Sequence, residues 1–258
     1  DGSRVVTVCS DGFVRIWDLA SGREAVTLEG HASIVNCARF SSDGLRVITA
    51  SDDGTARVWD AASGRELVKL DQHTNFVLSA SFSSDGKRIV TTSADSTARV
   101  WDASSGRELA RLNGHEDWGW GRDASFSSTG ARVVTVFDGG KACVWDASSG
   151  SAIATLGEHE GWVHDASFSP DGSLLVACMD EFAGVWDVAA GREISKLLGH
   201  TNLVNHARFS PEGLRVVTAS DDGTARVWDA ESGRELVRLE GHTCYVRNAS
   251  FSPDGARV

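Results

Sequence analysis

Histidine, serine and aspartate, the residues most often used in hydrolytic catalysis, recur throughout this chain of 258 residues. The stretch His159-Glu-Gly-Trp-Val-His164 resembles a zinc motif, but its histidines are one residue too far apart and it lies in a predicted loop, not on a helix. The chain contains neither a Gly-x-Ser-x-Gly nucleophile motif nor a phosphate-binding glycine loop. We therefore expect a protein that is not an enzyme, with no catalytic residue, no bound metal and no cofactor.

Composition narrows the possible partners. The 36 acidic and 25 basic residues give a formal net charge of -11, which disfavours a nucleic acid, because binding to phosphates needs clustered cations. The sequence has neither an apolar run long enough for a membrane span nor a signal peptide, and it opens at Asp1 without methionine, as a piece of a longer protein would. The five scattered cysteines favour a reducing compartment, so we expect a cytoplasmic protein that does not enter a membrane.

The chain consists of repeats. Trp-Asp occurs six times, about 42 residues apart, a period typical of repeat architectures, with its tryptophans at positions 17, 59, 101, 145, 186 and 228. A histidine follows each Trp-Asp at one fixed interval. Each copy reads as four short strands separated by turns that contain glycine, which predicts an antiparallel sheet. Such a sheet cannot cover both of its faces alone, so we expect six sheets to stack around an axis into a closed ring.

Three features of the repeat, the Gly-His, the Ser-Pro-Asp-Gly turn and the terminal Trp-Asp, make the whole chain resemble the WD-repeat β-propeller family. The resemblance implies an all-β fold, a closed propeller of four-stranded antiparallel blades, as a single domain over residues 1–258. It also implies that a hydrogen-bonded chain of His, Thr, Asp and Trp staples each blade. The matching positions are His31, Thr49, Asp53 and Trp59; His73, Thr91, Asp95 and Trp101; and His200, Thr218, Asp222 and Trp228.

The two ends of the chain share a motif, because Asp1-Gly-Ser-Arg-Val5 resembles Asp254-Gly-Ala-Arg-Val258. We expect the C-terminal strand 245–252 to complete the first blade, so that the ring has no open edge. On this reading the fourth staple joins residues from both ends: His242, Thr7, Asp11 and Trp17. The family more often has seven blades, and a further repeat beyond Val258 is the alternative.

One loop departs from the pattern. HEDWGWGRDASFS (115–127) has two residues more than its counterparts, and its repeat carries Phe137 and Gly139 where the sister repeats carry Ser and Asp. The next repeat lacks one residue and offers Val176 or Ala177 where Thr belongs. The tryptophans outside Trp-Asp, at 118, 120 and 162, fall in these two repeats. This concentration indicates either a functional loop or a decaying repeat.

Large apolar residues follow the His loop in every copy. They are Ile34, Phe76, Trp120, Trp162, Leu203 and Tyr245, with Trp118 nearby in the inserted loop. The family resemblance places this position at the rim of one face, although ordinary packing between blades is an alternative. Two residues further on, the copies carry Asn36, Leu78, Arg122, His164, Asn205 and Arg247. We expect these apolar residues, with Arg122, His164 and Arg247, to bind a protein or an acidic peptide.

The sequence thus predicts an interaction scaffold or sensor domain that binds a protein or peptide on one face. Near-identical repeats resemble propellers in large signalling proteins, where covalently linked neighbour domains do the chemistry. One alternative is a purely structural or self-associating propeller in a larger assembly. A second alternative is a small-molecule or glycan site in the central channel.

Overall fold

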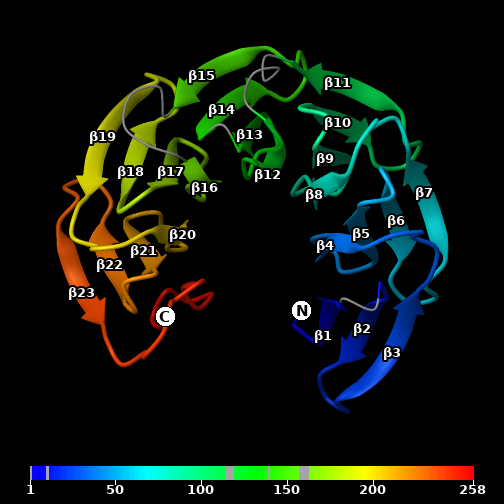
Figure 1. Cartoon of the computed structure of the whole chain (residues 1–258), viewed down its shortest axis with the longest axis horizontal. Helices are drawn as coiled ribbons and strands as arrows, with labels where there is room; N and C mark the ends of the chain where they lie inside the picture. The colour runs from blue at the N-terminus through cyan, green and yellow to red at the C-terminus, as the bar shows by residue number, and fades with distance from the viewer. Residues whose placement is uncertain (1, 10–11, 114–118, 139, 157–162) are drawn as a thin grey trace. The chain divides into compact units, whose positions relative to one another are not determined.

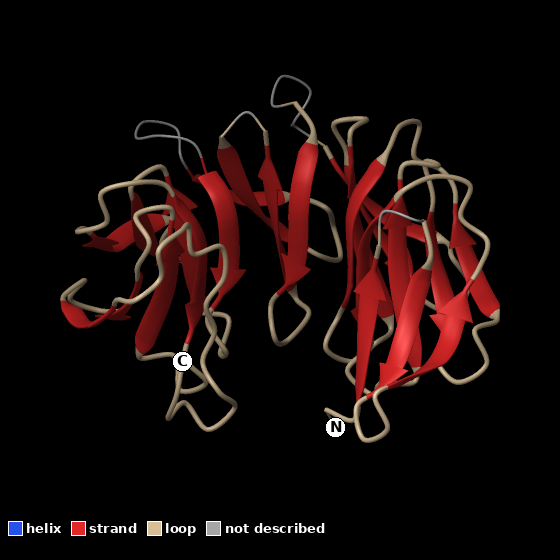
Figure 2. Ribbon diagram, turned by 60° about the horizontal axis from the view of Figure 1, so that its bottom comes forward, coloured by secondary structure: helices blue, strands red, loops and turns tan. Residues whose placement is uncertain are grey.

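The computed structural model describes residues 2–9, 12–113, 119–138, 140–156 and 163–258. In these ranges the chain forms 23 strands, β1 to β23, and the strands pair antiparallel (Figure 1). Figure 2 shows that these ranges consist of strands and loops. Among the described residues there is no helix of the length and apolarity that crossing a membrane requires. The predicted all-β, antiparallel fold is confirmed.

The chain divides into two compact units, which are described separately. Unit 1 comprises Asp1–Phe126 and Ala147–Gly150, and unit 2 comprises Ser127–Asp146 and Ser151–Val258. The single domain with a first blade completed by residues 245–252 stays a prediction.

Unit 1 contains three sheets and the strand β12 (Gly121–Phe126), and within each sheet neighbouring strands in the chain pair with one another. The first sheet has three strands: β1 (Arg4–Val8), β2 (Val14–Asp18) and β3 (Arg23–Leu28). The second has four: β4 (Val35–Phe40), β5 (Arg46–Ser51), β6 (Ala56–Asp60) and β7 (Glu66–Leu70). The third also has four: β8 (Val77–Phe82), β9 (Arg88–Ser93), β10 (Ala98–Asp102) and β11 (Glu108–Leu112).

Unit 2 continues the same pattern. Three strands pair in order: β13 (Arg132–Phe137), β14 (Lys141–Asp146) and β15 (Ala152–Leu156). The next sheet has four strands: β16 (Val163–Phe168), β17 (Leu174–Met179), β18 (Phe182–Asp187) and β19 (Arg192–Leu197). The last sheet also has four: β20 (Val204–Phe209), β21 (Arg215–Ser220), β22 (Ala225–Asp229) and β23 (Glu235–Leu239). Residues 245–252 lie outside any strand.

The second strand of each four-stranded sheet is buried on both faces. In β5, β9, β17 and β21, every residue after the first is buried. Within unit 1, one core cluster joins Ile16 of the first sheet to Val47 and Trp59 of the second. Another joins Val58 of the second sheet to Trp101 of the third. Sheets therefore stack face to face within the unit, which covers the second strands on both faces.

The aspartate of each Trp-Asp shapes the turn that follows it. Asp60 Oδ1 accepts hydrogen bonds from the Ser63 amide at 2.7 Å and from the Ser63 hydroxyl at 2.6 Å. These bonds from Ser63 hold the pKa of Asp60 below its ordinary value. Gly64 follows with a φ of 72°, and a Cβ there would lie 2.8 Å from Val26 Cγ1 of the first sheet. The Ser-Gly-Arg turn therefore needs glycine both for its conformation and for the close approach of the preceding sheet.

Except in β17, which begins at Leu174, each second strand begins with an arginine that contacts the next repeat. In unit 1, Arg46 Nη2 donates to the Gly86 carbonyl at 2.6 Å, and its guanidinium carbon lies 5.0 Å from the centre of the Phe82 ring. In unit 2, Arg215 binds the Gly255 carbonyl at 3.0 Å and lies 5.2 Å from the Phe251 ring. Each arginine thus combines a charge-assisted hydrogen bond with a cation–π contact.

We expect Arg46→Met to lower the free energy of unfolding by about 2 kcal/mol, because it removes the bond to the Gly86 carbonyl and the contact with Phe82. Urea unfolding followed by tryptophan fluorescence measures the change. Arg65→Met, on an exposed turn, is the matched control and should change stability by less than about 0.5 kcal/mol. Equal losses in the two variants would show that the contacts between sheets contribute nothing specific.

Candidate interaction surface

The loop before β4 is fixed to its own sheet by a chain of buried hydrogen bonds. His31 Nε2 lies 2.7 Å from Thr49 Oγ1, and His31 Nδ1 lies 2.8 Å from Asp53 Oδ2. Trp59 Nε1 donates to the same threonine oxygen at 2.8 Å. The aspartate accepts, so Nδ1 carries the histidine proton, and Nε2 accepts the threonine hydroxyl proton. The chain therefore holds the loop in one position relative to β5 and β6.

The same chain recurs in two other sheets. In unit 1, His73 binds Thr91 at 2.7 Å and Asp95 at 2.8 Å, and Trp101 donates to Thr91 at 2.9 Å. In unit 2, His200 lies 2.7 Å from both Thr218 and Asp222, and Trp228 donates to Thr218 at 2.8 Å. The structure brings together all twelve staple residues that the sequence indicates in these three repeats.

The first sheet contains only part of its predicted staple within unit 1. Trp17 Nε1 donates to Thr7 Oγ1 at 2.8 Å, as in the other sheets. Asp11 lies outside the described residues, and His242 belongs to unit 2. The contact of His242 with this sheet stays a prediction.

Both ionisable groups of the staple have shifted pKa values. Burial lowers the pKa of His200, and the hydrogen bond that its Nδ1 donates to Asp222 only partly opposes this effect. Burial acts to raise the pKa of Asp222, but hydrogen bonds from Thr224 and His200 outweigh it and bring the pKa well below its ordinary value. His31 and Asp53 shift in the same directions, with the same opposing effects. The native staple therefore contains a neutral histidine and an ionised aspartate at neutral pH.

An arginine and a glutamate extend the staple, and both are absent from the residues inferred from the sequence. Arg57 Nη1 donates to Glu66 at 2.8 Å, and its Nη2 lies 3.4 Å from Asp53. Arg226 and Glu235 repeat this pair in unit 2 at 2.7 Å. The signal was present, because Ala-Arg-Val-Trp and Gly-Arg-Glu-Leu recur at a fixed spacing.

The two irregular repeats differ in what they retain. Trp145 Nε1 still donates to Thr135 at 2.8 Å, although Gly139, at the aspartate position, lies outside the described residues. In the next sheet Ala177 pairs with Gly184. This pair corresponds in register to Thr49 and Arg57 of the second sheet. Trp186 Nε1 is buried and has no hydrogen-bond partner among the described residues. The register thus identifies Ala177, rather than Val176, as the residue in the threonine position.

Unit 1 exposes three of the predicted apolar residues. Ile34, Phe76 and Trp120 have exposed fractions of 55%, 41% and 51%. Each directly precedes a buried residue at the start of a strand, namely Val35, Val77 and Gly121. We call Ile34, Phe76 and Trp120 the unit 1 rim residues. Their exposure does not favour the alternative that these side chains pack between sheets. Trp118 and Trp162 lie outside the described residues.

In unit 2, Tyr245 is exposed and Leu203 is partly buried. The guanidinium carbon of Arg247 lies 5.3 Å from the Tyr245 ring, and Arg247 Nη1 lies 3.7 Å from Asp221. His164 Nε2 lies 3.5 Å from Asp180 Oδ1, within ion-pair distance but without hydrogen-bond geometry. Arg247 and His164 therefore each have a carboxylate beside them, which reduces the preference for an acidic partner. The third expected cation, Arg122, is exposed in unit 1.

Asparagines fix the backbone next to the rim positions. Asn36 Nδ2 donates to Asp52 Oδ1 at 2.7 Å and to the Val77 carbonyl of the neighbouring sheet at 3.0 Å. Asn205 makes the equivalent bonds in unit 2, to Asp221 at 2.7 Å and to the Val246 carbonyl at 3.1 Å. Leu78 takes the asparagine position in the third sheet and is partly buried. Each of these asparagines thus ties the backbone at its rim position to the following segment of the chain.

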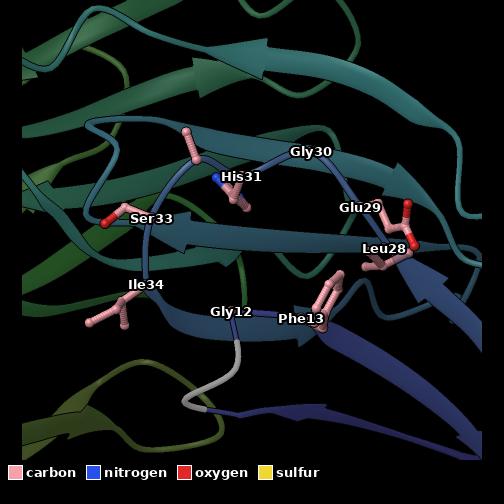
Figure 3. Close-up of a pocket in the computed structure, with 9 residues that line it drawn as sticks. Gly12, Phe13, Leu28, Glu29, Gly30, His31, Ser33 and Ile34 are labelled. Carbon is pink, nitrogen blue, oxygen red and sulfur yellow. The ribbon is translucent and has the colours of Figure 1, made fainter.

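A hollow of about 350 Å³ opens beside the His31 loop in unit 1, between Gly12–Phe13 and residues 28–34 (Figure 3). Phe13 is exposed there, at the position that threonine takes in the repeats with a complete staple. Phe13 is not among the site residues predicted from the sequence. A comparison of the repeats could have identified it, because it is an apolar residue at a position that is otherwise polar in the complete repeats. The described residues include no group of three or more metal-binding side chains.

We expect Ala177→Thr to raise the free energy of unfolding by about 1 kcal/mol, because it supplies an acceptor for the buried Trp186 Nε1. Thr218→Ala should lower it by about 1–3 kcal/mol, because Trp228 and His200 then lose their shared partner. Chemical unfolding measures both changes. A neutral or destabilising effect of Ala177→Thr would show that Trp186 already has a partner.

The pKa shifts also predict a pH dependence of stability. The unfolded state binds protons at its histidines near the ordinary value of about 6.5, while the buried native histidines, whose pKa is lowered, stay neutral. The free energy of unfolding should therefore fall as the pH drops below about 6.5, by at most about 1.4 kcal/mol per pH unit for each histidine. The lowered aspartate pKa values add a further loss below the ordinary carboxyl pKa of about 4.

Urea unfolding at pH 7.5 and at pH 5.5 tests this dependence in the wild type and in His200→Gln. The variant should be less stable at pH 7.5 but should lose less stability on acidification, since it lacks one of the shifted histidines. A wild type that gains stability at the lower pH would contradict the neutral native histidine.

The family comparison agrees with the repeat geometry. A family model described as WD domain, G-beta repeat, matches residues 1–18, 22–60, 64–102, 150–187 and 191–229, more than half of the chain. Residues 103–149, which include the inserted loop, are outside these matches. No curated protein matches the chain. The matched repeats, the Trp-Asp dipeptides and the His–Thr–Trp staples together show that the chain belongs to the WD40 repeat family.

Proposed function

We propose that this chain is a non-enzymatic platform that binds a protein or peptide through its exposed rim residues. WD40 repeats generally mediate protein–protein interactions, and members of the family are typically scaffolds rather than enzymes. The proposal is that the unit 1 rim residues, Ile34, Phe76 and Trp120, form a contact surface. The observation that carries it is their exposure at the same position in successive repeats.

A strand start does not by itself require an exposed apolar side chain. The turn at the far end of the first strand gives a comparison, because the residue type at its last position varies. The six copies carry Leu45, Lys87, Ala131, Ser173, Leu214 and Ala256 there. That turn accepts polar, charged and small residues, whereas every copy carries a large apolar residue at the rim position. A partner that covers these side chains is the physical benefit that would offset their exposure to water.

Rigid support makes such a surface suited to binding. The His31 and His73 staples and the Asn36 bonds fix the backbone around Ile34 and Phe76, so little conformational entropy is lost when a partner docks. Trp120 offers the largest apolar area and an indole N–H, a combination enriched at interface hot spots. We therefore assign the largest share of binding energy to Trp120.

The remaining rim residues belong to the same proposal. They are Trp118, Arg122, Trp162, His164, Leu203, Tyr245 and Arg247. A closed β-propeller would bring them together on one face, and the repeat sequence supports that closure. We further propose that the chain acts within a larger cytoplasmic signalling protein, supported by the near-identity of residues 50–70 and 219–239.

We expect Trp120→Ala to weaken partner binding by about 2 kcal/mol or more, roughly a thirtyfold change in Kd. The wild-type chain and the variant are immobilised, exposed to extract from the source cells, and compared by quantitative mass spectrometry. A protein retained by the wild type and lost from Trp120→Ala is then purified and titrated against both chains, and against Ile34→Ala and Phe76→Ala.

Leu45→Ala is the matched control, because Leu45 is an exposed apolar residue at the opposite end of β4. It should bind the partner with unchanged affinity, and all variants must keep the wild-type melting temperature. Equal binding by every variant would place the contact surface elsewhere. Self-association that Trp120→Ala abolishes, seen by sedimentation, would instead support the self-associating scaffold.

A further inference from the structure

Complete repeats enclose an arginine between a tryptophan and a glutamate. In unit 2, Arg226 Nη1 donates to Glu235 at 2.7 Å, and its guanidinium carbon lies 5.9 Å from the centre of the Trp228 ring. Arg99 of unit 1 makes the same two contacts over the same distances. The two arginine side chains are only 5% and 6% exposed. Each of these repeats therefore contains a nearly buried guanidinium site, built from a carboxylate and the face of an indole.

The repeat that contains Trp186 keeps two members of this group and lacks the arginine. Trp186 pairs with Glu193 across β18 and β19, which is the register of the tryptophan and the glutamate in the last sheet. Gly184, two residues before Trp186, stands at the position of Arg226. The tryptophan and the glutamate are therefore in their usual places, and a glycine replaces the arginine between them.

The backbone does not require glycine at this position. Gly184 lies inside β18, and its φ is not positive. A glycine inside a strand weakens the strand, and it often marks a place where a ligand or another chain approaches closely. The missing side chain, rather than the conformation of the backbone, is therefore what this glycine contributes.

The carboxylate of Glu193 and the indole of Trp186 converge on the position of the missing side chain. A Cβ on Gly184 would lie 2.7 Å from Glu193 Oε1 and 2.9 Å from Trp186 Nε1. Trp228 is fully buried, whereas Trp186 is partly exposed, and the side chain of Glu193 is 24% exposed. The carboxylate is the end of a flexible side chain, so it can swing outward to meet an incoming cation. Both groups are thus accessible to a ligand from solvent.

The preceding repeat has lost the whole group. Cys143 stands at the arginine position and Ala152 at the glutamate position, and Trp145 is only 2% exposed. That repeat therefore has neither charge, and its tryptophan is covered. In the repeat of Trp186, by contrast, Glu193 remains although the arginine is gone. A partly buried carboxylate is unfavourable unless a cation accompanies it, so its retention points to a cation that binds there.

One cation of the chain already lies beside this carboxylate. Lys196 Nζ is 3.7 Å from Glu193 Oε2. The equivalent residue of the second sheet is Lys69, which pairs with Asp71 at 3.8 Å while Arg57 binds the glutamate of that sheet. A lysine at this position is therefore compatible with a guanidinium group on the glutamate.

We propose that Gly184, Trp186 and Glu193 form an arginine subsite, which binds the guanidinium group of an arginine side chain from a partner protein or peptide. Glu193 accepts hydrogen bonds from the guanidinium N–H groups, and the exposed part of the Trp186 ring stacks against the guanidinium plane. Lysine does not substitute for arginine here, because the planar guanidinium is the group that the complete repeats hold in this place. The proposal concerns unit 2 and does not rest on the binding role of the unit 1 rim residues.

The test titrates the full 258-residue chain with N-acetylarginine methylamide and follows the indole N–H signals by heteronuclear NMR. The variant Trp186→Phe identifies the signal of Trp186. We expect this signal to shift saturably, with a Kd in the millimolar range, because a single guanidinium group makes few contacts. The corresponding citrulline compound, which has nearly the same shape but no charge, should bind at least about tenfold more weakly. Glu193→Gln should weaken binding of the arginine compound by a similar factor.

Glu235→Gln is the matched control, because Glu235 has the same register in a repeat whose site is filled by Arg226. It should leave the affinity for the arginine compound unchanged. Gly184→Arg should fill the subsite with an arginine of the chain itself, abolish binding of the compound and raise the Tm. If Gly184→Arg does not fold, the comparison of Glu193→Gln with Glu235→Gln still decides.

The proposal is overturned if the Trp186 signal of the wild type does not shift saturably, or if the citrulline compound binds as tightly as the arginine compound. It is also overturned if Glu193→Gln binds the arginine compound like the wild type. Trp120→Ala should bind the compound with wild-type affinity. A failure of the arginine subsite is therefore distinguishable from a failure of the unit 1 rim residues as a contact surface.

Discussion

The structure depends on one buried threonine hydroxyl in each complete repeat. Thr49 accepts the indole proton of Trp59 and donates to His31, whose other nitrogen is held by Asp53. A buried indole or imidazole without a partner would cost about 1–3 kcal/mol, so these groups favour a single arrangement. This arrangement joins the third strand, the second strand and the entering loop of one sheet. The position of the loop, and with it the position of Ile34, follows from this bond.

Contacts between sheets act on a different part of each repeat. Arg46 and Asn36 reach carbonyl groups of the following sheet, and Gly64 allows the preceding sheet to approach closely. The staple therefore stabilises one sheet, whereas these residues stabilise a stack. The repeat with Trp186 has lost its threonine, yet its sheet keeps four paired strands, because the apolar core around Leu175 and Val185 remains. One missing polar bond is tolerated within a unit that is held by packing on both faces.

Much of the fold could be predicted from the sequence. The spacing of Trp-Asp and His indicated the strands, and the resemblance to the WD-repeat family implied the twelve staple residues that lie together in three sheets. Two features could not be predicted in the same way. The deletion near Ala177 leaves its register ambiguous by one residue, and only the pairing of Ala177 with Gly184 resolves it. Arg57 and Glu66 were not inferred because a charged pair on a strand reads as solvent-exposed until its partners are known.

The sequence by itself determined the repeat, the four-strand pattern and the residue types of the staple, because these depend on local spacing and on chemistry within one sheet. Only the tertiary structure decided which apolar residues are exposed. Ile34 and Val35 are adjacent and similar in character, yet one faces solvent and the other is buried. Burial depends on what the neighbouring sheet covers, and that information is not contained in the sequence of a single repeat.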